Sequence, residues 1–326
     1  MSLSPDQITI AVTVFNRRDY VLQAIESALT QTSAVNVIVV EDCGPDQGLK
    51  QFVQDRFGPG IHYHRNPQRR GLFDNWNACV ELCKTPWLSI LHDDDFLSPR
   101  FIAAMLDLAE KAPGRGFYFG QVTVIDPLGN RLPAQGFAAA RSWREVDLVS
   151  FANGNPTLFP GQLFRIDHAK AVGGFRPTSL FAGDWEMWFK LSAAYGSAQT
   201  RDEVAFARAH LGYERGTRKI ERSGRKCALD NVQRKRNLAI LKRMGYVVQF
   251  ERQPPDWPAI PLRFLLQYGR GFSPRILAYN ARLFGLSKPP HWRYAVVQAV
   301  ARLMGARLLR AMSAWWNRLP HLGNRS

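Results

Sequence analysis

Three consecutive aspartates, Asp93-Asp94-Asp95, form the cluster in this chain whose residue types suggest chemistry most directly. Three adjacent carboxylates repel one another, so they take up protons, lie in solvent on a turn, or bind a divalent cation through oxygen. A solvated turn is the ordinary alternative for an acidic run. Here the run follows a short apolar stretch at 87–91 and precedes Ser98-Pro99, which is typical of a helix start with proline at the first position. This position favours a cation site at the end of a buried strand.

Polar clusters also follow the other strands that the sequence predicts. The predicted strands are 8–14, 35–40, 61–64 and 87–91. The clusters after the first three are Phe15-Asn16-Arg17-Arg18, Glu41-Asp42, and the arginine-rich loop from Arg65 to Gly71. Open α/β sheets bind their ligands at the carboxyl ends of parallel strands. The arginines precede a predicted helix at 72–83, so they are placed to meet a phosphate, although such loops are often only solvated.

The elements that must position these clusters alternate between strands and helices. Apolar residues at helical spacing predict helices at 21–29, 72–83 and 101–110 between the strands. A strand pair is expected around 126–130 and a further strand at 162–165. Three βα units in succession predict an α/β fold with a mostly parallel, Rossmann-like sheet flanked by helices.

Asp184 lies in a second segment of interest, at the start of a predicted helix. Carboxylates in a first helical turn, here Asp184 and Glu186, are often only favourable toward the helix dipole. A glycine-rich approach through Gly173-Gly174 and the neighbouring Trp185 and Trp188 favour a functional role for Asp184.

Composition excludes several classes of protein. With 326 residues and 46% hydrophobic side chains, the chain is globular and long enough for one large domain or two. Its four cysteines form no CxxC pair, so we expect reduced thiols. Residues 1–7 lack the features of a signal peptide, and no apolar stretch has the length of a membrane span. Together these features predict a cytoplasmic protein.

The net charge of +16 is unevenly distributed. Residues 1–224 carry 24 basic and 24 acidic side chains, whereas residues 225–326 carry 19 basic and 3 acidic ones. We therefore predict two regions, a neutral domain at 1–224 and a basic region at 225–326 that faces an anionic partner.

The basic region reads as several short α-helices separated by prolines. In the last of them, 293–319, apolar residues with tryptophan share one face and arginines lie on the other. Such a helix suits an anionic membrane surface, where each cation contributes about 1 kcal/mol. A helix that packs on the catalytic domain or on a partner protein is an equally open alternative. No nucleic-acid-binding signature is present, so we expect no nucleic acid partner.

Five segments across residues 8–215 resemble, in order, the family 2 glycosyltransferases of the GT-A fold. They are Val12-Thr13-Val14-Phe15-Asn16-Arg17, Val39-Val40-Glu41-Asp42, Arg65-Asn66-Pro67 with Arg70-Gly71, His92-Asp93-Asp94-Asp95, and Val172-Gly173-Gly174-Phe175 before Gly183-Asp184. Each segment alone is a weak signal. Five in the family's order are specific for the family but say little about substrate.

The resemblance implies a metal-dependent, inverting transfer from a nucleotide-sugar. Mg²⁺ or Mn²⁺ would stabilise the departing diphosphate as a Lewis acid. Asp93 and Asp95 match the DxD pair of the family, with Asp95 as the direct metal ligand and Asp93 nearer the ribose, and Asp94 belongs to the same donor-binding group. His210 matches a histidine that reaches the metal or the diphosphate.

The resemblance also assigns the nucleotide and the base. Asp42 matches the carboxylate that accepts from the nucleobase, with Phe15 and Asn16 beside it, and Arg70 would lie near the base or diphosphate. A UDP-sugar is the favoured donor. Asp184 matches the second letter of the family's ED motif, so it would take the proton of the acceptor hydroxyl.

The sequence departs from the family at four places. Gly183 stands where the family usually has Glu, which removes a carboxylate that orients the acceptor. Glu186 could substitute for that carboxylate, although a solvent-exposed position is the more ordinary expectation for this residue. Cys43-Gly44-Pro45 replaces the common Gly-Ser-Thr, and His92 replaces a frequent Asp. The Gln-x-x-Arg-Trp signature of processive synthases is absent, which favours addition of a single sugar.

These features predict a glycosyltransferase that acts on a glycan or a polyprenyl-linked glycan in the synthesis of surface polysaccharide. We expect it in the cytoplasm, with peripheral attachment to the cytoplasmic face of the inner membrane as the further expectation from the basic region. Two alternatives stay open. A nucleotidyltransferase would share the sheet and paired aspartates but usually has a glycine-rich signature near its first strand, which is missing. A non-catalytic scaffold would act through the basic region, but it would not need Asp42, Asp93, Asp95 and Asp184.

Overall fold

The computed structural model describes residues 3–132, 142–177, 182–209 and 225–248. The chain divides into two compact units, one containing residues 1–212 and 237–246 and the other containing 213–236 and 247–326. The first unit contains every predicted site residue whose structure is described. His210 and the predicted helix at 293–319 lie outside the described residues.

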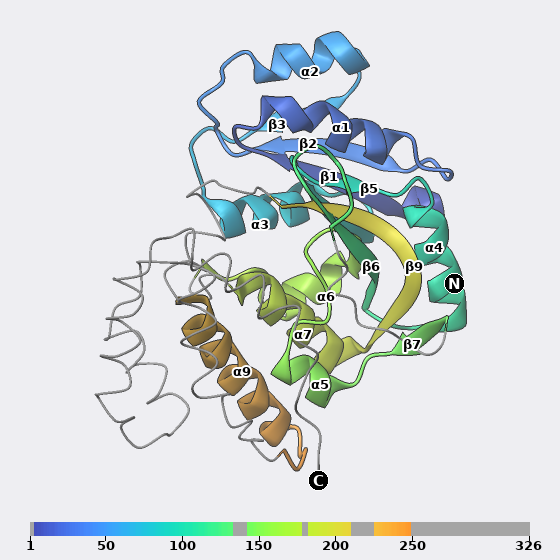
Figure 1. The fold of residues 1–326 in the computed structure, drawn as a ribbon, viewed down its shortest axis with the longest axis vertical. Coiled ribbons are helices and arrows are strands. Elements are labelled where there is room, and N and C mark those ends of the chain that lie inside the picture. The colour runs from blue at the N-terminus through green and yellow to red at the C-terminus, as the bar shows by residue number, and fades with distance from the viewer. Residues whose placement is uncertain (1–2, 133–141, 178–181, 210–224, 249–326) are drawn as a thin grey trace, which may run out of the picture. The chain divides into compact units, whose positions relative to one another are not determined.

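Nine strands of the described residues form one sheet, in the order β3-β2-β1-β4-β8-β6-β9-β5 with β7 paired to β9 (Figure 1). Their bounds are β1 Ile8–Val14, β2 Asn36–Glu41, β3 His62–Arg65, β4 Trp87–His92, β5 Phe96–Leu97, β6 Phe117–Ile125, β7 Trp143–Glu145, β8 Gln162–Arg165 and β9 Ser197–Arg208.

The first four strands are parallel, as predicted. Strand β1 pairs with β2 on one side and with β4 on the other, and β2 pairs with β3. Every residue of β1 is buried, which explains its continuous apolar and β-branched sequence. Because Val14 pairs with Glu41 and Thr13 with His92, the carboxyl ends of these strands lie at one edge. The segments after them therefore start close together.

The other half of the sheet is mixed. Strand β8 is antiparallel to both β4 and β6, β6 is parallel to β9, and β5 is antiparallel to β9. The predicted mostly parallel arrangement thus holds for β3-β2-β1-β4. Strand β8 lies between β4 and β6 although it follows both in the chain, a long-range pairing that local sequence patterns do not reveal.

The helices α1, α3 and α4 match the predicted positions closely, whereas α2 and α5 were not predicted. Their bounds are α1 Arg18–Leu29, α2 Leu49–Phe57, α3 Leu72–Leu82, α4 Phe101–Lys111, α5 Leu148–Asn153, α6 Ile166–Ala171, α7 Gly183–Tyr195 and α9 Arg225–Arg243, preceded by a short 3-10 helix at Pro5–Gln7. The predicted helix at 101–110 is confirmed as α4, but the expected helix start at Ser98-Pro99 is wrong, because the N-cap is Arg100. The helix begins at Phe101, and its first N–H groups bond into the turn, where Phe101 N donates to the Ser98 carbonyl at 3.0 Å.

Helices cover both faces of the β1–β2 part of the sheet. Helices α1 and α3 lie on opposite sides of it (Figure 1). Ile8, Ile10, Val12 and Val14 of β1 belong to one apolar core with the buried faces of α1, α2 and α4. The alternation of side chains along a strand sends the intervening residues of β1 to the other face. No helix in the described part of the chain is both long and apolar enough to cross a membrane.

Candidate functional site

The acidic turn lies between β4 and β5 and is buried. The exposed fractions of Asp93, Asp94 and Asp95 are 7%, 8% and 7%. A solvated turn is therefore the wrong description of these residues. Because burial of unpaired carboxylates is costly, each side chain needs a partner that offsets its charge.

Those partners come from three different parts of the sheet edge. Phe15 N, just after β1, donates to Asp93 Oδ2 at 3.2 Å. The Arg17 guanidinium forms an ion pair with Asp94 and lies 3.8 Å from Asp93 Oδ1. Arg208 N, at the end of β9, donates to Asp95 Oδ1 at 2.8 Å. Each carboxylate thus has its own partner. The backbone N–H groups of Phe15 and Arg208 bind Asp93 and Asp95, and the Arg17 side chain binds Asp94.

Arg208 supports the turn from behind and was not singled out from the sequence. Its side chain is buried, and Nε donates to the Asp94 carbonyl at 3.0 Å. The guanidinium also donates to Gln23 on α1 at 2.7 Å and to the Pro127 carbonyl at 2.9 Å, and it stacks 4.4 Å from the centre of the Tyr20 ring. A single arginine at the end of the apolar strand sequence Val204-Ala205-Phe206-Ala207 was the available signal.

One subset of the turn has donor atoms close enough together to hold a metal ion. Single ligand atoms of His92, Asp94 and Asp95 all lie within 4.8 Å of one another. Two carboxylates and an imidazole suit Mn²⁺, and the carboxylates suit Mg²⁺. The residues present therefore fit a divalent cation. Asp93, which was predicted as a metal ligand, is not in this group. His92, which replaces a frequent Asp of the family, is in it.

The protonation of this subset follows from its burial. Burial raises the pKa of Asp95 to about 7, against the lowering effect of the Arg208 backbone N–H. Burial, together with the nearby Arg17, lowers the pKa of His92 to about 3. The imidazole is therefore neutral and able to act as a metal ligand. It also stacks on the rings of Phe159, at 4.1 Å, and Trp76, at 5.5 Å.

Asp42 lies at the neighbouring strand end and caps the loop before α3. Its carboxylate accepts from Arg70 N at 2.7 Å, from Gly71 N at 2.9 Å and from Asn66 Nδ2 at 3.4 Å. The sequence comparison implied a contact with a nucleobase. The structure places this carboxylate at the sheet edge as predicted and shows that it also orders the loop from Asn66 to Gly71.

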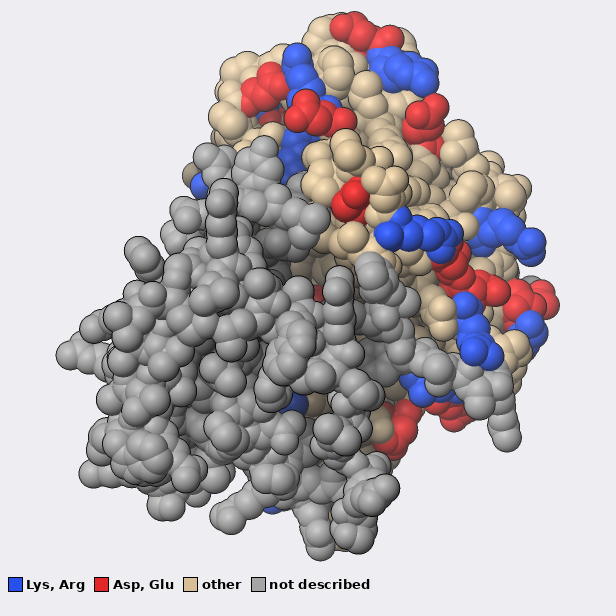
Figure 2. Space-filling view, viewed as in Figure 1, with Lys and Arg blue, Asp and Glu red and all other residues tan. Residues whose placement is uncertain are grey.

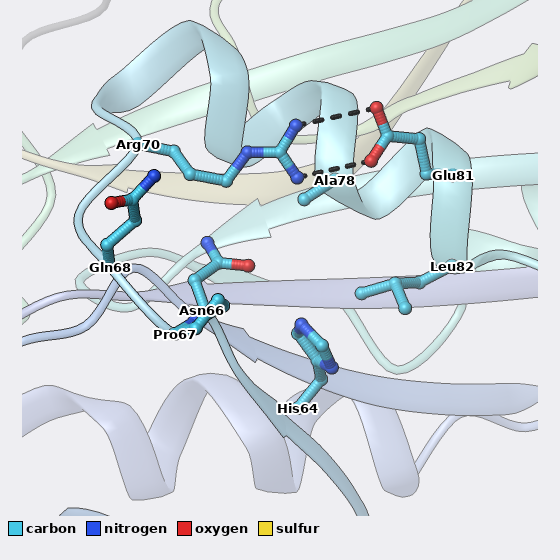
Figure 3. Close-up of a pocket in the computed structure, with 8 residues that line it drawn as sticks. All are labelled: His64, Asn66, Pro67, Gln68, Arg70, Ala78, Glu81 and Leu82. Carbon is cyan, nitrogen blue, oxygen red and sulfur yellow. Dashed lines mark hydrogen bonds and ion pairs between the residues drawn. The ribbon is translucent and has the colours of Figure 1, made fainter.

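Arg70 points along α3. Its guanidinium donates to Glu81 Oε2 at 3.1 Å, and this ion pair raises the pKa of Arg70. Both side chains line an open pocket of about 360 Å³ together with His64, Asn66, Pro67, Gln68, Ala78 and Leu82 (Figure 3). Arg70 is thus adjacent to Asp42 through its backbone, while its charged group is held at this pocket.

Phe15 and Asn16 form the loop after β1. The Arg69 guanidinium lies over the Phe15 ring at 4.5 Å, which joins this loop to the one before α3. Asn16 is exposed. Gly44 allows the close approach of the loop after β2, because a Cβ there would lie 1.8 Å from the Phe15 carbonyl oxygen. A larger residue at position 44 would clash with Phe15, which explains the glycine in the Cys43-Gly44-Pro45 segment.

Asp184 lies in the first turn of α7, as predicted, and Asn155 Nδ2 donates to its Oδ2 at 3.2 Å. Gly183 before it packs against Phe73, whose Cε1 lies 2.1 Å from the position of an added Cβ. A Phe73 ring thus fills the space beside Asp184 where the family usually has a glutamate. The expected exposure of Glu186 is wrong, because its side chain is buried and pairs with Arg176 and Lys190.

The aromatic residues beneath the acidic turn connect it with α7. Phe159 stacks on His92 at 4.1 Å, and its ring centre lies 6.0 Å from that of Trp188, which is on α7 one turn after Asp184. The structure thus brings Phe15 and Arg17 into contact with the carboxylates of Asp93 and Asp94. The rings of Phe159 and Trp188 join the turn to the helix that carries Asp184.

Comparison with known proteins adds a family and a fold. The family model described as "Glycosyl transferase family 2" matches residues 9–172, half of the chain. The succinoglycan biosynthesis protein ExoO of Rhizobium meliloti is 28% identical over 167 residues, which cover 50% of this chain and 45% of that protein. The chain spans less than half the length of the first curated relatives that it matches.

Two solved structures share its fold. The structure of S. aureus TarS 1–349 in complex with UDP-GlcNAc has a TM-score of 0.53 and 14% identity, over 95% of this chain and 92% of that one. The mannosyltransferase PcManGT of Pyrobaculum calidifontis, in complex with GDP-Man and Mn²⁺, also has a TM-score of 0.53, with 17% identity over 97% of this chain and 90% of that one. This likeness confirms the GT-A type of fold predicted from the sequence.

Proposed function

The chain belongs to glycosyl transferase family 2, and on that premise we propose that it transfers one sugar from a nucleoside diphosphate donor to a hydroxyl of a glycan or lipid-linked glycan. The observation that carries the proposal is the buried acidic turn at the carboxyl edge of β4. Its three carboxylates outnumber the two arginines that contact the turn, Arg17 and Arg208. That excess suits a site whose ligand includes a divalent cation and a diphosphate.

A divalent cation would be held by His92, Asp94 and Asp95, whose donor atoms already lie together. Bound there, Mn²⁺ or Mg²⁺ supplies Lewis acidity for a leaving diphosphate. The presence of Mn²⁺ in the PcManGT complex supports this choice of ion. The roles of Asp93 as a second ligand and of His210 stay predictions from the family resemblance.

Asp184 would act as the general base. The acceptor oxygen attacks the anomeric carbon on the side opposite the diphosphate, and its proton passes to a carboxylate oxygen of Asp184. The bond between the anomeric carbon and the diphosphate oxygen breaks, and the diphosphate leaves with the electron pair. Asn155 Nδ2 donates to Asp184 Oδ2 and so helps to orient this carboxylate. Attack from the opposite face inverts the configuration of the sugar.

The donor nucleotide would lie along the loops after β1 and β2. Phe15 and Asn16 border this edge, and Asp42 offers its remaining acceptor capacity to the base. Arg70 would serve the diphosphate or base after leaving Glu81. The UDP-GlcNAc complex of TarS is consistent with the favoured UDP-sugar, whereas the GDP-Man complex of PcManGT keeps GDP-sugars in consideration.

The acceptor is proposed from the relatives and from the basic region. ExoO is named for succinoglycan biosynthesis, which supports a role for this chain in surface polysaccharide synthesis. The charge excess of residues 225–326 supports work beside an anionic membrane, at the cytoplasmic face if the acceptor is polyprenyl-linked.

The experiment is slow hydrolysis of the donor, in which water replaces the unknown acceptor. UDP-, GDP-, CDP- and dTDP-sugars are incubated with the protein and Mn²⁺, and release of nucleoside diphosphate is measured. Proton NMR of the first sugar released reports its anomeric configuration. Release from one class, with inversion and loss in Asp95→Ala, supports the proposal. Release of pyrophosphate from a nucleoside triphosphate and sugar phosphate would instead support a nucleotidyltransferase, and no turnover with any donor would favour a scaffold.

A further inference from the structure

Two arginines serve the acidic turn, and their surroundings differ. Arg208 is buried, and its side chain donates to backbone carbonyls and to Gln23, so it is fixed in the fold. Arg17 lies in the loop before α1, and 40% of its side-chain surface is exposed. Its recorded partners are the carboxylates of Asp93 and Asp94. Arg17 therefore has both the freedom and the solvent access to change partners.

The position of Arg17 overlaps with the proposed cation site. Asp94 contributes a ligand atom to the group formed with His92 and Asp95, and the same carboxylate is in contact with the Arg17 guanidinium. A guanidinium hydrogen-bonded to a carboxylate occupies the directions in which that carboxylate would bind a metal. Arg17 and a divalent cation therefore compete for the Asp94 carboxylate, and each weakens the binding of the other.

Charge favours the exchange once both ligands of the proposed reaction are present. Arg17 offsets one charge of the three carboxylates, whereas a divalent cation offsets two. The cation can therefore replace Arg17 and still leave the turn with less net negative charge. A nucleoside diphosphate then brings further negative charge to the same edge, where an arginine fork binds phosphate oxygens well.

We infer that Arg17 is an exchangeable counterion, which neutralises Asp94 in the cation-free protein, yields that carboxylate to the divalent cation, and then binds the diphosphate of the donor. This inference rests on the proposed function, because it names the cation and the diphosphate of that site. It adds a diphosphate-binding residue to the proposed site.

The test compares Arg17→Gln with wild type and with Arg56→Gln as a matched control. Arg56 lies on α2, is exposed at 54%, and pairs with Glu26 of α1 at 3.1 Å, outside the loops of the proposed site. Isothermal titration measures two affinities, that of Mn²⁺ alone and that of UDP or GDP at saturating Mn²⁺. Each is a binding measurement that needs no acceptor and no turnover.

Opposite changes in the two affinities are expected. Arg17→Gln should bind Mn²⁺ alone about tenfold more tightly, because no internal cation competes for Asp94. It should bind the nucleoside diphosphate about tenfold more weakly, because one phosphate ligand is lost. Arg56→Gln should match wild type in both titrations.

The contrary results are distinct. Weaker or unchanged Mn²⁺ binding by Arg17→Gln, with normal nucleotide binding by wild type, would overturn the exchange and leave the proposed function intact. Absence of Mn²⁺ and nucleotide binding in wild type would overturn both. Thermal unfolding is a second measurement on the same proteins. Cation-free Arg17→Gln should melt below wild type and gain more from Mn²⁺, whereas equal gains in both proteins would also overturn the inference.

Discussion

At the scale of a single residue, a substitution of Asp184 separates the effect on donor binding from the effect on the chemical step. Its carboxylate accepts from Asn155, and the proposal gives it the proton of the acceptor hydroxyl. Asp184→Asn keeps the size of the side chain but removes the base. We expect turnover to fall by about 10²- to 10⁴-fold, the usual contribution of a general base, with donor affinity unchanged.

Turnover and titration with nucleoside diphosphate on the same preparation check this prediction. Glu186→Gln is not a suitable control, because Glu186 is buried and ion-paired. Glu145→Gln is better, since Glu145 is exposed on β7. Full activity in Asp184→Asn would remove Asp184 from the base role.

Gly44 controls the approach of two site loops at the same scale. An added Cβ would lie 1.8 Å from the backbone oxygen of Phe15, which has no flexible end to move away. Gly44→Ala should therefore lower the free energy of unfolding by about 1–3 kcal/mol and weaken nucleotide binding. Chemical denaturation and titration measure the two effects. Gly60→Ala, where nothing lies within 4 Å of the added Cβ, should change neither.

At the scale of elements, Arg208 joins β9 to the acidic turn and to α1. Replacing it with methionine leaves the Asp94 and Pro127 carbonyls without their donors, and it removes the stack on Tyr20. We expect Arg208→Met to cost about 3 kcal/mol of folding free energy, as for other broken buried charge networks. Arg201→Met, on the same strand but exposed, is the matched control. A loss of folding free energy below 1 kcal/mol in Arg208→Met would show that the acidic turn does not depend on Arg208 for its stability.

Local sequence patterns predicted the elements around the site well, and long-range pairing explains what they missed. The run Ile8–Val14 and the alternation of apolar and polar segments identify β1 to β4 and the helices between them, because burial sets these patterns locally. Strand β8 between β4 and β6, and the contact of Arg208 with a turn 113 residues earlier, depend on pairing between distant segments. No local period encodes such a contact.

The site shows the same division. The strand-end position of the aspartates was predictable from sequence order, since parallel strands end at one edge. The presence of His92 in the metal-ligand group and the pairing of Arg17 with Asp94 were not, because they depend on side-chain orientation. The exposure expected for Glu186 failed for a related reason. Its partner Arg176 comes from a separate segment that folds against α7.

At the scale of the whole molecule, charge separates the two regions of the sequence. Basic and acidic side chains are interspersed over the described surface in Figure 2, in keeping with the balance within residues 1–224. The excess of +16 belongs to residues 225–326. We predict that the full chain binds vesicles containing anionic lipid and does not bind neutral ones, because cations near such a surface each contribute about 1 kcal/mol.

Co-sedimentation with vesicles at low and at physiological salt measures this binding. Affinity should fall as salt rises, since screening weakens attraction to the surface. Equal binding to neutral and anionic vesicles, or no binding at physiological salt, would contradict the membrane role and leave a protein partner for the basic region.

The central claim is that the acidic turn is a metal-dependent nucleotide site. Calorimetric titration with UDP, GDP, CDP and dTDP, with and without Mn²⁺, tests it most directly when repeated on Asp95→Ala. We predict selective binding of one nucleotide, dependent on Mn²⁺ and lost in the variant. Nucleotide binding that is unaffected by Mn²⁺ and by Asp95→Ala, or no binding by any nucleotide, would contradict it.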